Sequence, residues 1–394
     1  MKPPGIGFAV SLGAITLIAP LSIHLFLPAM PAVQAVFGVS DALVQLAFSV
    51  TMFTMAIVTP VYGTLSDRLG RRPVLLIGLA LFLAGSLVAA TAPTIAVLIL
   101  GRMVQAAGAG CGLTLTRAMA RDAYGPEGLV KAIAYLTIAY TLGPMLSPPF
   151  GGLLIDMIGW RSIFWFALIA GTLITAGAAI VLHETRSPTD RANHPAGLLA
   201  LYGALLRDRS FLGFILQSGF MSFAFFGLAS ASPFLVTGML GRSATEYGVG
   251  FMFMPLAYCC GNIISSRLSG RVSVERMVLI GSVLCFTAMV VQAAIILGGH
   301  LSLLIIFAPG AVMTFSQGLA LPNAQAGAIR VKPGLAGTAA GLGVFVQLML
   351  SAVPAQLNGF FADGTARPMI LLTVSGAALA VVSAASLFVR PQRA

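Results

Sequence analysis

The chain alternates between long apolar runs and short polar gaps. We identify twelve apolar runs of about 20 residues, each long enough to cross about 30 Å of hydrocarbon as a helix. Only helices or closed barrels satisfy the backbone in lipid, and barrel strands alternate apolar and polar residues, which these runs do not. The pattern therefore predicts an all-α membrane protein with twelve transmembrane helices. The runs are Phe8–Leu27, Leu43–Pro60, Val74–Ala90, Ile95–Leu115, Leu129–Ile155, Ile163–Val181, Phe211–Val236, Gly248–Ile264, Met277–Leu297, Leu301–Leu321, Leu335–Leu357 and Pro368–Phe388.

The longest polar gap, His183–Arg209, divides the chain into halves of six runs each, and it contains Pro188, Asp190 and Pro195. Within it, Leu198–Leu206 is apolar enough to lie along the inner membrane surface as a short interfacial helix. We therefore expect an N-terminal six-helix bundle at residues 1–183, a cytoplasmic linker at 184–209 and a C-terminal six-helix bundle at 210–394.

The two halves resemble each other. The segment Gly63–Gly78 follows the second run, and Gly261–Gly281 follows the eighth; Gly125–Gly143 and Lys332–Leu350 form a second pair. The offset is roughly 200 residues in both pairs, as expected when six helices are repeated. Such a repeat is typical of secondary transporters whose substrate site lies between the halves. We expect two pseudo-symmetric bundles.

The net charge of +11 is explained by how the chain is oriented in the membrane. With both termini cytoplasmic, 18 of the 22 Lys and Arg residues fall in cytoplasmic gaps or tails, and only Arg161, Arg242 and Arg367 face outside. This asymmetry is the positive-inside rule. It explains the basicity without a nucleic-acid partner, so we expect none.

Enzyme chemistry has little support in the chain. The four cysteines all fall in apolar runs, where they resemble small apolar side chains, and no metal-ligand cluster or nucleophile–base pair is present. We expect no catalytic residue, no metal and no cofactor. The first run is too long for a signal peptide and lacks a clear small-residue cleavage site, so we expect it to be retained as a helix.

The loop after the second run carries the strongest motif. It reads Gly63-Thr-Leu-Ser-Asp67-Arg68-Leu-Gly70-Arg71-Arg72. It resembles the G-x-L-x-D-R-x-G-R-R loop of the major facilitator superfamily at every defining position. A basic inner surface explains the arginines but not Asp67. We expect Asp67 to dock on the positive N-terminal end of the eleventh span, as a latch that biases which way the transporter opens. The resemblance implies such a gating role for Asp67 and Arg72.

Two further signatures follow. Leu98–Gly110 resembles the superfamily pattern R-x-x-Q-G-x-G-A, with Ala106 in place of a glycine, and Thr141–Leu154 resembles the G-P-x-x-G-G signature of antiporters. Glycines allow close helix contact and prolines kink the span. Seven further segments carry a closer resemblance: Ser22–Val33, Leu115–Gly125, Ile133–Gly152, Trp160–Phe166, Ala229–Val236, Gln317–Ala328 and Ala336–Leu342. Through them, nearly the whole chain is similar to the Bcr/CflA branch of drug–proton antiporters. The antiporter signature comprises Gly143, Pro144, Pro148, Gly151 and Gly152.

The first run departs from that branch. Relatives typically read D-x-Y-L-P-A-x-P, with the acid as proton and cation site, whereas this chain has His24 at the acid position and Phe26 at the tyrosine position. No other acid falls at mid-membrane depth. Burial disfavours the imidazolium, so we expect His24 to be neutral in the empty site and to take a proton when an anion binds. The alternative is a histidine that fills space and bonds a neighbouring helix.

Arg102 is the only charged residue well inside an apolar run. A charge in the membrane is costly and usually functional, which favours contact with cargo. The other interpretation is an arginine capped by carbonyl groups that stabilises a helix contact. Polar side chains in the spans also serve either as ligands or as interhelical hydrogen bonds. The candidate substrate and coupling residues are His24, Phe26, Arg102, Gln105, Tyr140, Gln217 and Gln347.

These observations favour a secondary transporter in a bacterial inner membrane. We expect a monomer, surrounded by membrane lipid, that exports small amphiphilic compounds by alternating access and uses protons. Export of one endogenous metabolite, such as a siderophore-like or amino-acid-derived product, is the alternative. A membrane sensor that kept the fold but lost turnover is disfavoured, because the Asp67 loop and the antiporter signature are intact.

Overall fold

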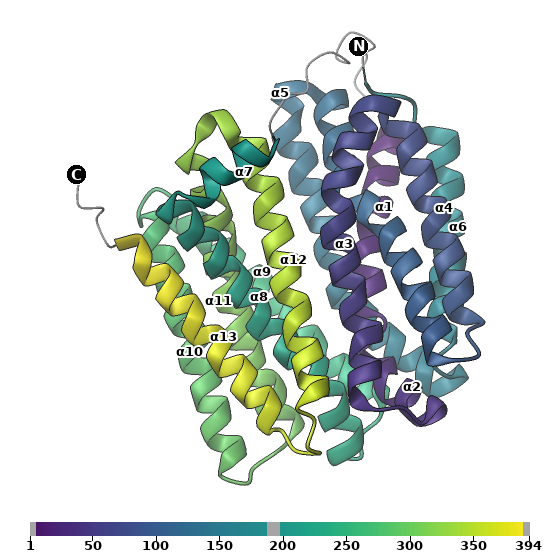
Figure 1. Cartoon of the computed structure of the whole chain (residues 1–394), viewed down its shortest axis with the longest axis vertical. Coiled ribbons are helices and arrows are strands. Elements are labelled where there is room, and N and C mark those ends of the chain that lie inside the picture. The colour runs from purple at the N-terminus through teal and green to yellow at the C-terminus, as the bar shows by residue number, and fades with distance from the viewer. Residues whose placement is uncertain (1–4, 187–197, 389–394) are drawn as a thin grey trace. The chain divides into compact units, whose positions relative to one another are not determined.

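The computed structural model describes residues 5–186 and 198–388, and these are almost entirely helical (Figure 1). Within these ranges, twelve helices are long and apolar enough to cross a membrane. The twelve expected spans are thus confirmed. The elements are α1 (Ile6–His24), η1 (Leu27–Ala29), α2 (Met30–Phe37), α3 (Asp41–Leu69), α4 (Arg71–Ala90), α5 (Ile95–Ile158), α6 (Ser162–Val181), α7 (Leu198–Leu206), α8 (Arg209–Phe234), η3 (Leu235–Met239), α9 (Ala244–Leu268), α10 (Val274–Leu297), α11 (Leu303–Val331), η4 (Pro333–Leu335), α12 (Ala336–Phe360), α13 (Arg367–Ala385) and η5 (Ser386–Phe388).

Two compact units make up the chain. The first unit is Met1–His194 together with Ser243–Gly248. Its central element is α5, which packs against α1, α3 and α4. Helix α5 contains two membrane spans, which meet at Gly125; the backbone there has φ +61°, a left-handed conformation that favours glycine. One long element therefore supplies the fourth and fifth spans.

The second unit is Pro195–Arg242 together with Val249–Ala394. Its central element is α8, which packs against α11, α12 and α13, while α10 packs against α11 and α13. The short helix predicted at Leu198–Leu206 is confirmed as α7. It is held by buried Leu205 and by the Lys332 ammonium, which donates to the Ala204 carbonyl at 2.7 Å.

The interfacial position expected for α7 stays a prediction, as do the domain boundaries at residues 183 and 210. Pro188, Asp190 and Pro195 of the linker lie outside the described residues.

The first span is broken, which corrects the single helix expected at Phe8–Leu27. Helix α1 ends at His24, a bend follows, and η1 and α2 carry the span on to Phe37. Pro28 has no N–H to donate to the His24 carbonyl, and Pro31 has none for Leu27, so an unbroken α-helix cannot continue here. An apolar run reports burial and not backbone continuity, so hydropathy alone did not detect the break.

Glycines bring α4 and α5 into backbone contact. A Cβ atom on Gly85 of α4 would overlap the backbone nitrogen of Gln105, and one on Gly108 of α5 would overlap that of Phe82. The second unit uses the same device between α9 and α11, where Gly261 lies on the Phe315 carbonyl. Small residues at membrane helix contacts are the usual means of close approach, because dispersion forces fall off steeply with distance.

We therefore predict that Gly85→Ala lowers the thermal unfolding midpoint of the purified protein, because the new methyl group must push α4 away from α5. The expected loss is about 1–3 kcal/mol. Gly177→Ala in α6 is the matched control, since a Cβ there meets nothing within 4 Å. That variant should match or exceed the wild-type midpoint, because alanine is the better helix former. Equal midpoints for the Gly85 variant and the wild type, measured by tryptophan fluorescence in detergent, would contradict the packing argument.

Candidate functional site

The guanidinium of Arg102 is buried in the first unit and bonds groups on α1, α3 and α5. Only 1% of the surface of Arg102 is exposed. The Nη1 atom donates to the Ser22 carbonyl at 2.8 Å and to Gln105 Oε1 at 2.7 Å, and Nε reaches the Ala47 carbonyl at 3.4 Å. The Phe26 ring lies 4.6 Å from the guanidinium carbon. Oxygen acceptors and an aromatic face thus surround the charge, which no carboxylate neutralises among the described residues.

Gln105 extends this hydrogen-bond network to two more helices. Its Oε1 atom also accepts the Ser22 hydroxyl at 3.3 Å, and its Nε2 atom donates to the Ser86 hydroxyl at 2.9 Å. All three side chains are buried. The network therefore joins α1, α4 and α5 at one point, and it holds α1 two residues before that helix ends.

The antiporter signature lies against the broken first span. A Cβ on Gly143 would come within 2.6 Å of the Pro20 ring, and one on Gly151 would lie 3.1 Å from the Leu25 carbonyl and 3.4 Å from Pro28. Both glycines belong to the second span of α5, as do Pro144, Pro148 and Gly152. The two spans of α5 therefore contact the same break in α1, one through Arg102 and one through small residues.

Charged residues of the Asp67 loop form a cluster within the first unit. Asp67 Oδ1 pairs with Arg71 at 2.7 Å and with Arg186 at 3.1 Å. Arg71 also pairs with Asp122 at 3.0 Å, through its Nε atom. The Asp67 side chain is 37% exposed, so it has open surface beyond these two arginines. Helices α3, α4 and α5 and the segment after α6 are joined here by their charges.

Glu184 caps the start of α4. Its carboxylate accepts the backbone N–H groups of Arg71 at 2.9 Å and Arg72 at 3.1 Å, and that of Arg186 at 3.0 Å. Partial burial raises the pKa of Glu184, but these backbone hydrogen bonds outweigh it and lower the pKa below its usual value. Gly70 makes the cap possible. Its φ is +101°, and a Cβ atom there would lie 2.6 Å from Glu184 Oε2.

The remaining motif residues are placed around this cluster. The Arg72 guanidinium donates to the Ala179 carbonyl at 2.8 Å, which ties the start of α4 to the end of α6. Arg68 is exposed, and Gly63 lies on α3 one turn before Asp67. The loop thus contributes one acid and two arginines to contacts with other elements, while Arg68 is available to solvent or headgroups.

The other candidate substrate residues lie in three places. His24 is buried and is the last residue of α1. Tyr140 is half-buried on the second span of α5. In the second unit, Gln217 donates to the Ser282 hydroxyl and Gln347 to the Ser222 hydroxyl, each at 2.9 Å. The structure brings together Phe26, Arg102 and Gln105. His24 lies two residues before Phe26 in the sequence.

Several partners escaped sequence reasoning. Ser22 and Phe164 complete the surroundings of Arg102, with the Phe164 ring 5.8 Å from the guanidinium carbon, and Ser86 accepts a hydrogen bond from Gln105. Glu184 and Arg186 complete the charge cluster. For these last two a signal was present, because an acid and a base directly follow the sixth span. Ser22 and Phe164 fall in segments that resemble the Bcr/CflA branch, but nothing in the sequence pairs them with Arg102, and Ser86 carries no motif.

Comparisons with known proteins agree with the geometry. The Major Facilitator Superfamily family model matches residues 12–356. The chain is 30% identical to the uncharacterised MFS-type transporter YdgK of Bacillus subtilis (strain 168), over 92% of this chain and 91% of that protein. It is 29% identical to multidrug resistance protein D of Escherichia coli (strain K12), over 89% and 88%.

Among solved structures, a bacterial homologue of the human lysosomal transporter Spinster, in an inward-facing and unoccupied conformation, has a TM-score of 0.75. It is 15% identical and covers 98% of each chain, so it supports the fold alone. The motifs, the twelve helices and these similarities lead to one conclusion. The chain belongs to the Major Facilitator Superfamily and is a multi-pass membrane protein whose relatives are transporters.

Proposed function

We propose that the protein exports small amphiphilic compounds across a bacterial inner membrane, with both termini cytoplasmic, by alternating access. A relative named multidrug resistance protein D that aligns over 89% of this chain supports export of drug-like compounds. The positive-inside distribution of Lys and Arg supports the orientation. A secondary transporter needs a site at mid-membrane depth, and the break at the end of α1 is the best candidate for one, because broken helices are where transporters bind substrates and ions.

The charge content of the spans is the observation that carries the cargo preference. Every acid in the described ranges lies near the end of a membrane span or between two spans, whereas Arg102 is buried within a span. A cation moved to that depth would meet no carboxylate, and Arg102 would repel it. Neutral, zwitterionic and anionic amphiphiles are therefore the proposed substrates.

The proposed proton carrier is His24. It is the only histidine of the described residues that lies inside a span; His183 follows α6, and His300 lies between α10 and α11. Histidine titrates in the physiological range, and its charge can follow that of the bound cargo. A neutral imidazole in the empty site and an imidazolium with an anion bound would couple proton movement to export.

Gating is assigned to Asp67. Its carboxylate exchanges, in this proposal, between Arg71 and Arg186 on one side and the N-terminal end of α12 on the other. The exposed fraction of the side chain leaves room for such an exchange. When Asp67 is not docked on α12, Arg71 and Arg186 would bind its carboxylate. Loss of the negative charge would weaken both its pairing with these arginines and its docking on α12.

We predict that Asp67→Asn lowers transport in proteoliposomes by roughly tenfold or more while ligand binding stays within about threefold, because the latch biases conformations and does not contact cargo. Asp363→Asn is the control, since it removes a carboxylate from the exposed loop between α12 and α13. Wild-type turnover by the Asp67 variant would contradict the gating assignment.

We predict that anionic and zwitterionic amphiphiles are exported faster than permanent cations of similar size. Efflux of a matched compound panel from proteoliposomes tests this order. His24→Asp should shift the preference toward cations, because it places a carboxylate at the break in α1. Strong efflux of ethidium by the wild type, unchanged in this variant, would refute the charge argument. Transport of one compound class alone would instead favour a dedicated metabolite exporter.

We predict that His24→Ala abolishes accumulation driven by a pH gradient but keeps substrate exchange, since exchange needs the site and not the proton. His300→Ala is the matched control at an interhelical loop. The two variants are compared by counterflow with and without a pH gradient. Full gradient-driven transport by the His24 variant would show that another group carries the proton or that protons do not drive transport.

A further inference from the structure

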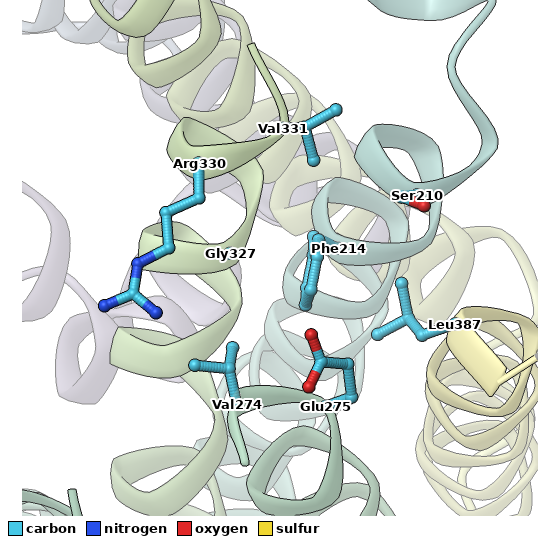
Figure 2. Close-up of a pocket in the computed structure, with 8 residues that line it drawn as sticks. All are labelled: Ser210, Phe214, Val274, Glu275, Gly327, Arg330, Val331 and Leu387. Atoms are coloured by element: carbon cyan, nitrogen blue, oxygen red, sulfur yellow. The ribbon is translucent and has the colours of Figure 1, made fainter. Parts of the chain in front are cut away.

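The second unit contains a cavity that the proposed transport site does not use. It has a volume of about 220 Å³ and lies between the starts of α8 and α10, the end of α11, and η5 (Figure 2). With the termini cytoplasmic, all these helix ends lie on the inner side of the membrane. The side chains that matter here are Ser210, Phe214, Val274, Glu275, Arg330 and Leu387.

The inner part of this cavity suits an ammonium group. Figure 2 shows the Glu275 carboxylate directed toward the Phe214 ring. Glu275 is half-buried and has no ion pair among the described residues. An aromatic face attracts cations, and the last turn of α11 adds the partial negative charge of a helix C-terminus. Carboxylate, ring and helix end therefore favour a cation in one small space.

The rim carries the opposite charge. Arg330 is exposed, and Figure 2 shows its guanidinium directed away from Glu275. It also forms no ion pair within the described ranges. A guanidinium is the usual partner of phosphate, which it can hold with two hydrogen bonds. The cavity thus matches a zwitterion whose ammonium enters and whose phosphate stays at the rim.

In the first unit, an ion pair occupies the place that corresponds to this cavity. There Arg71, at the start of α4, bridges to Asp122 on α5 at 3.0 Å. In the second unit the acid at the start of α10 and the base at the end of α11 are left apart. Gly327 makes room for the Phe214 ring, because a Cβ there would come within 2.5 Å of the tip of the ring.

The surroundings indicate a lipid as the source of the zwitterion. The cavity lies at the ends of membrane-spanning helices, and the ends of such helices are where lipid headgroups meet a protein. Val274 and Leu387 form its apolar edge, and exposed apolar residues such as Ile280 and Val382 continue along α10 and α13, where acyl chains would pack. A soluble zwitterion would gain nothing from that apolar surface.

We propose that this cavity binds the headgroup of an inner-leaflet phosphatidylethanolamine, with the ammonium between Glu275 and Phe214 and the phosphate at Arg330. Three ammonium hydrogens suit a carboxylate, whereas the trimethylammonium of phosphatidylcholine has none to donate. The proposal is independent of the transported cargo, because it is tested by binding and not by transport.

The experiment titrates the delipidated full-length protein with lipids of identical acyl chains and counts bound lipid by native mass spectrometry. The wild type should bind one phosphatidylethanolamine saturably and roughly tenfold more tightly than phosphatidylcholine or phosphatidylglycerol. Glu275→Gln should remove this preference, and Arg330→Gln should weaken phosphatidylethanolamine roughly tenfold. Arg271→Gln, which removes a charge from the loop before α10, should bind as the wild type does.

Two further arms keep the test decisive. Glu275→Asp retains the negative charge and should keep the preference for phosphatidylethanolamine, so a loss seen only with glutamine is not a folding defect. Unfolding midpoints of all variants are measured alongside. Equal binding of the three lipids by the wild type, or an unchanged preference in Glu275→Gln, would overturn the proposal. Equally tight binding of water-soluble glycerophosphoethanolamine would overturn the lipid as its source.

Discussion

A guanidinium inside a membrane span must find its hydrogen-bond partners within the protein, and Arg102 meets this constraint through Nη1 and Nε, while its Nη2 atom has no partner among the described residues. Arg102 finds its shortest backbone partner in the Ser22 carbonyl, in the last turn of α1. Carbonyl groups in a last turn have no intrahelical donor. The break in α1 therefore supplies the acceptor that the charge requires, and the charge satisfies the carbonyl that the break leaves free. Each feature would be costly without the other.

This reciprocity bears on how a transporter of this family manages without the acid typical of its branch. With His24 in that position, no ion pair among the described residues involves the broken span, and the Arg102 guanidinium bonds the Ser22 carbonyl and the Gln105 amide oxygen there. The glycines of the antiporter signature press on the same break from the other span of α5. Neutral acceptors and close packing therefore hold the break in α1 without a carboxylate.

Sequence reasoning predicted the spans well because apolarity and length suffice for that. The run at Ile163–Val181 differs from α6 by one residue at its start. Sequence reasoning missed the break after His24, because hydropathy does not register the backbone N–H groups that Pro28 and Pro31 lack. The loop motif identified Asp67 and Arg71, but their partners Asp122 and Arg186 lie 51 or more residues from Arg71 along the chain. Such pairings become visible only when the helices are packed.

The same comparison shows that the two halves are alike in topology and different in chemistry. In the first unit, Arg71 at the start of α4 forms ion pairs with Asp67 at the end of α3 and with Asp122 on α5. In the second, Glu275 and Arg330 stay apart around a cavity. Ion pairs at helix ends resist separation, whereas an open acid and base can accept an outside ligand. The charges at the helix ends of the first unit are thus paired with one another, while the acid and base around the cavity of the second unit form no ion pair within the described ranges.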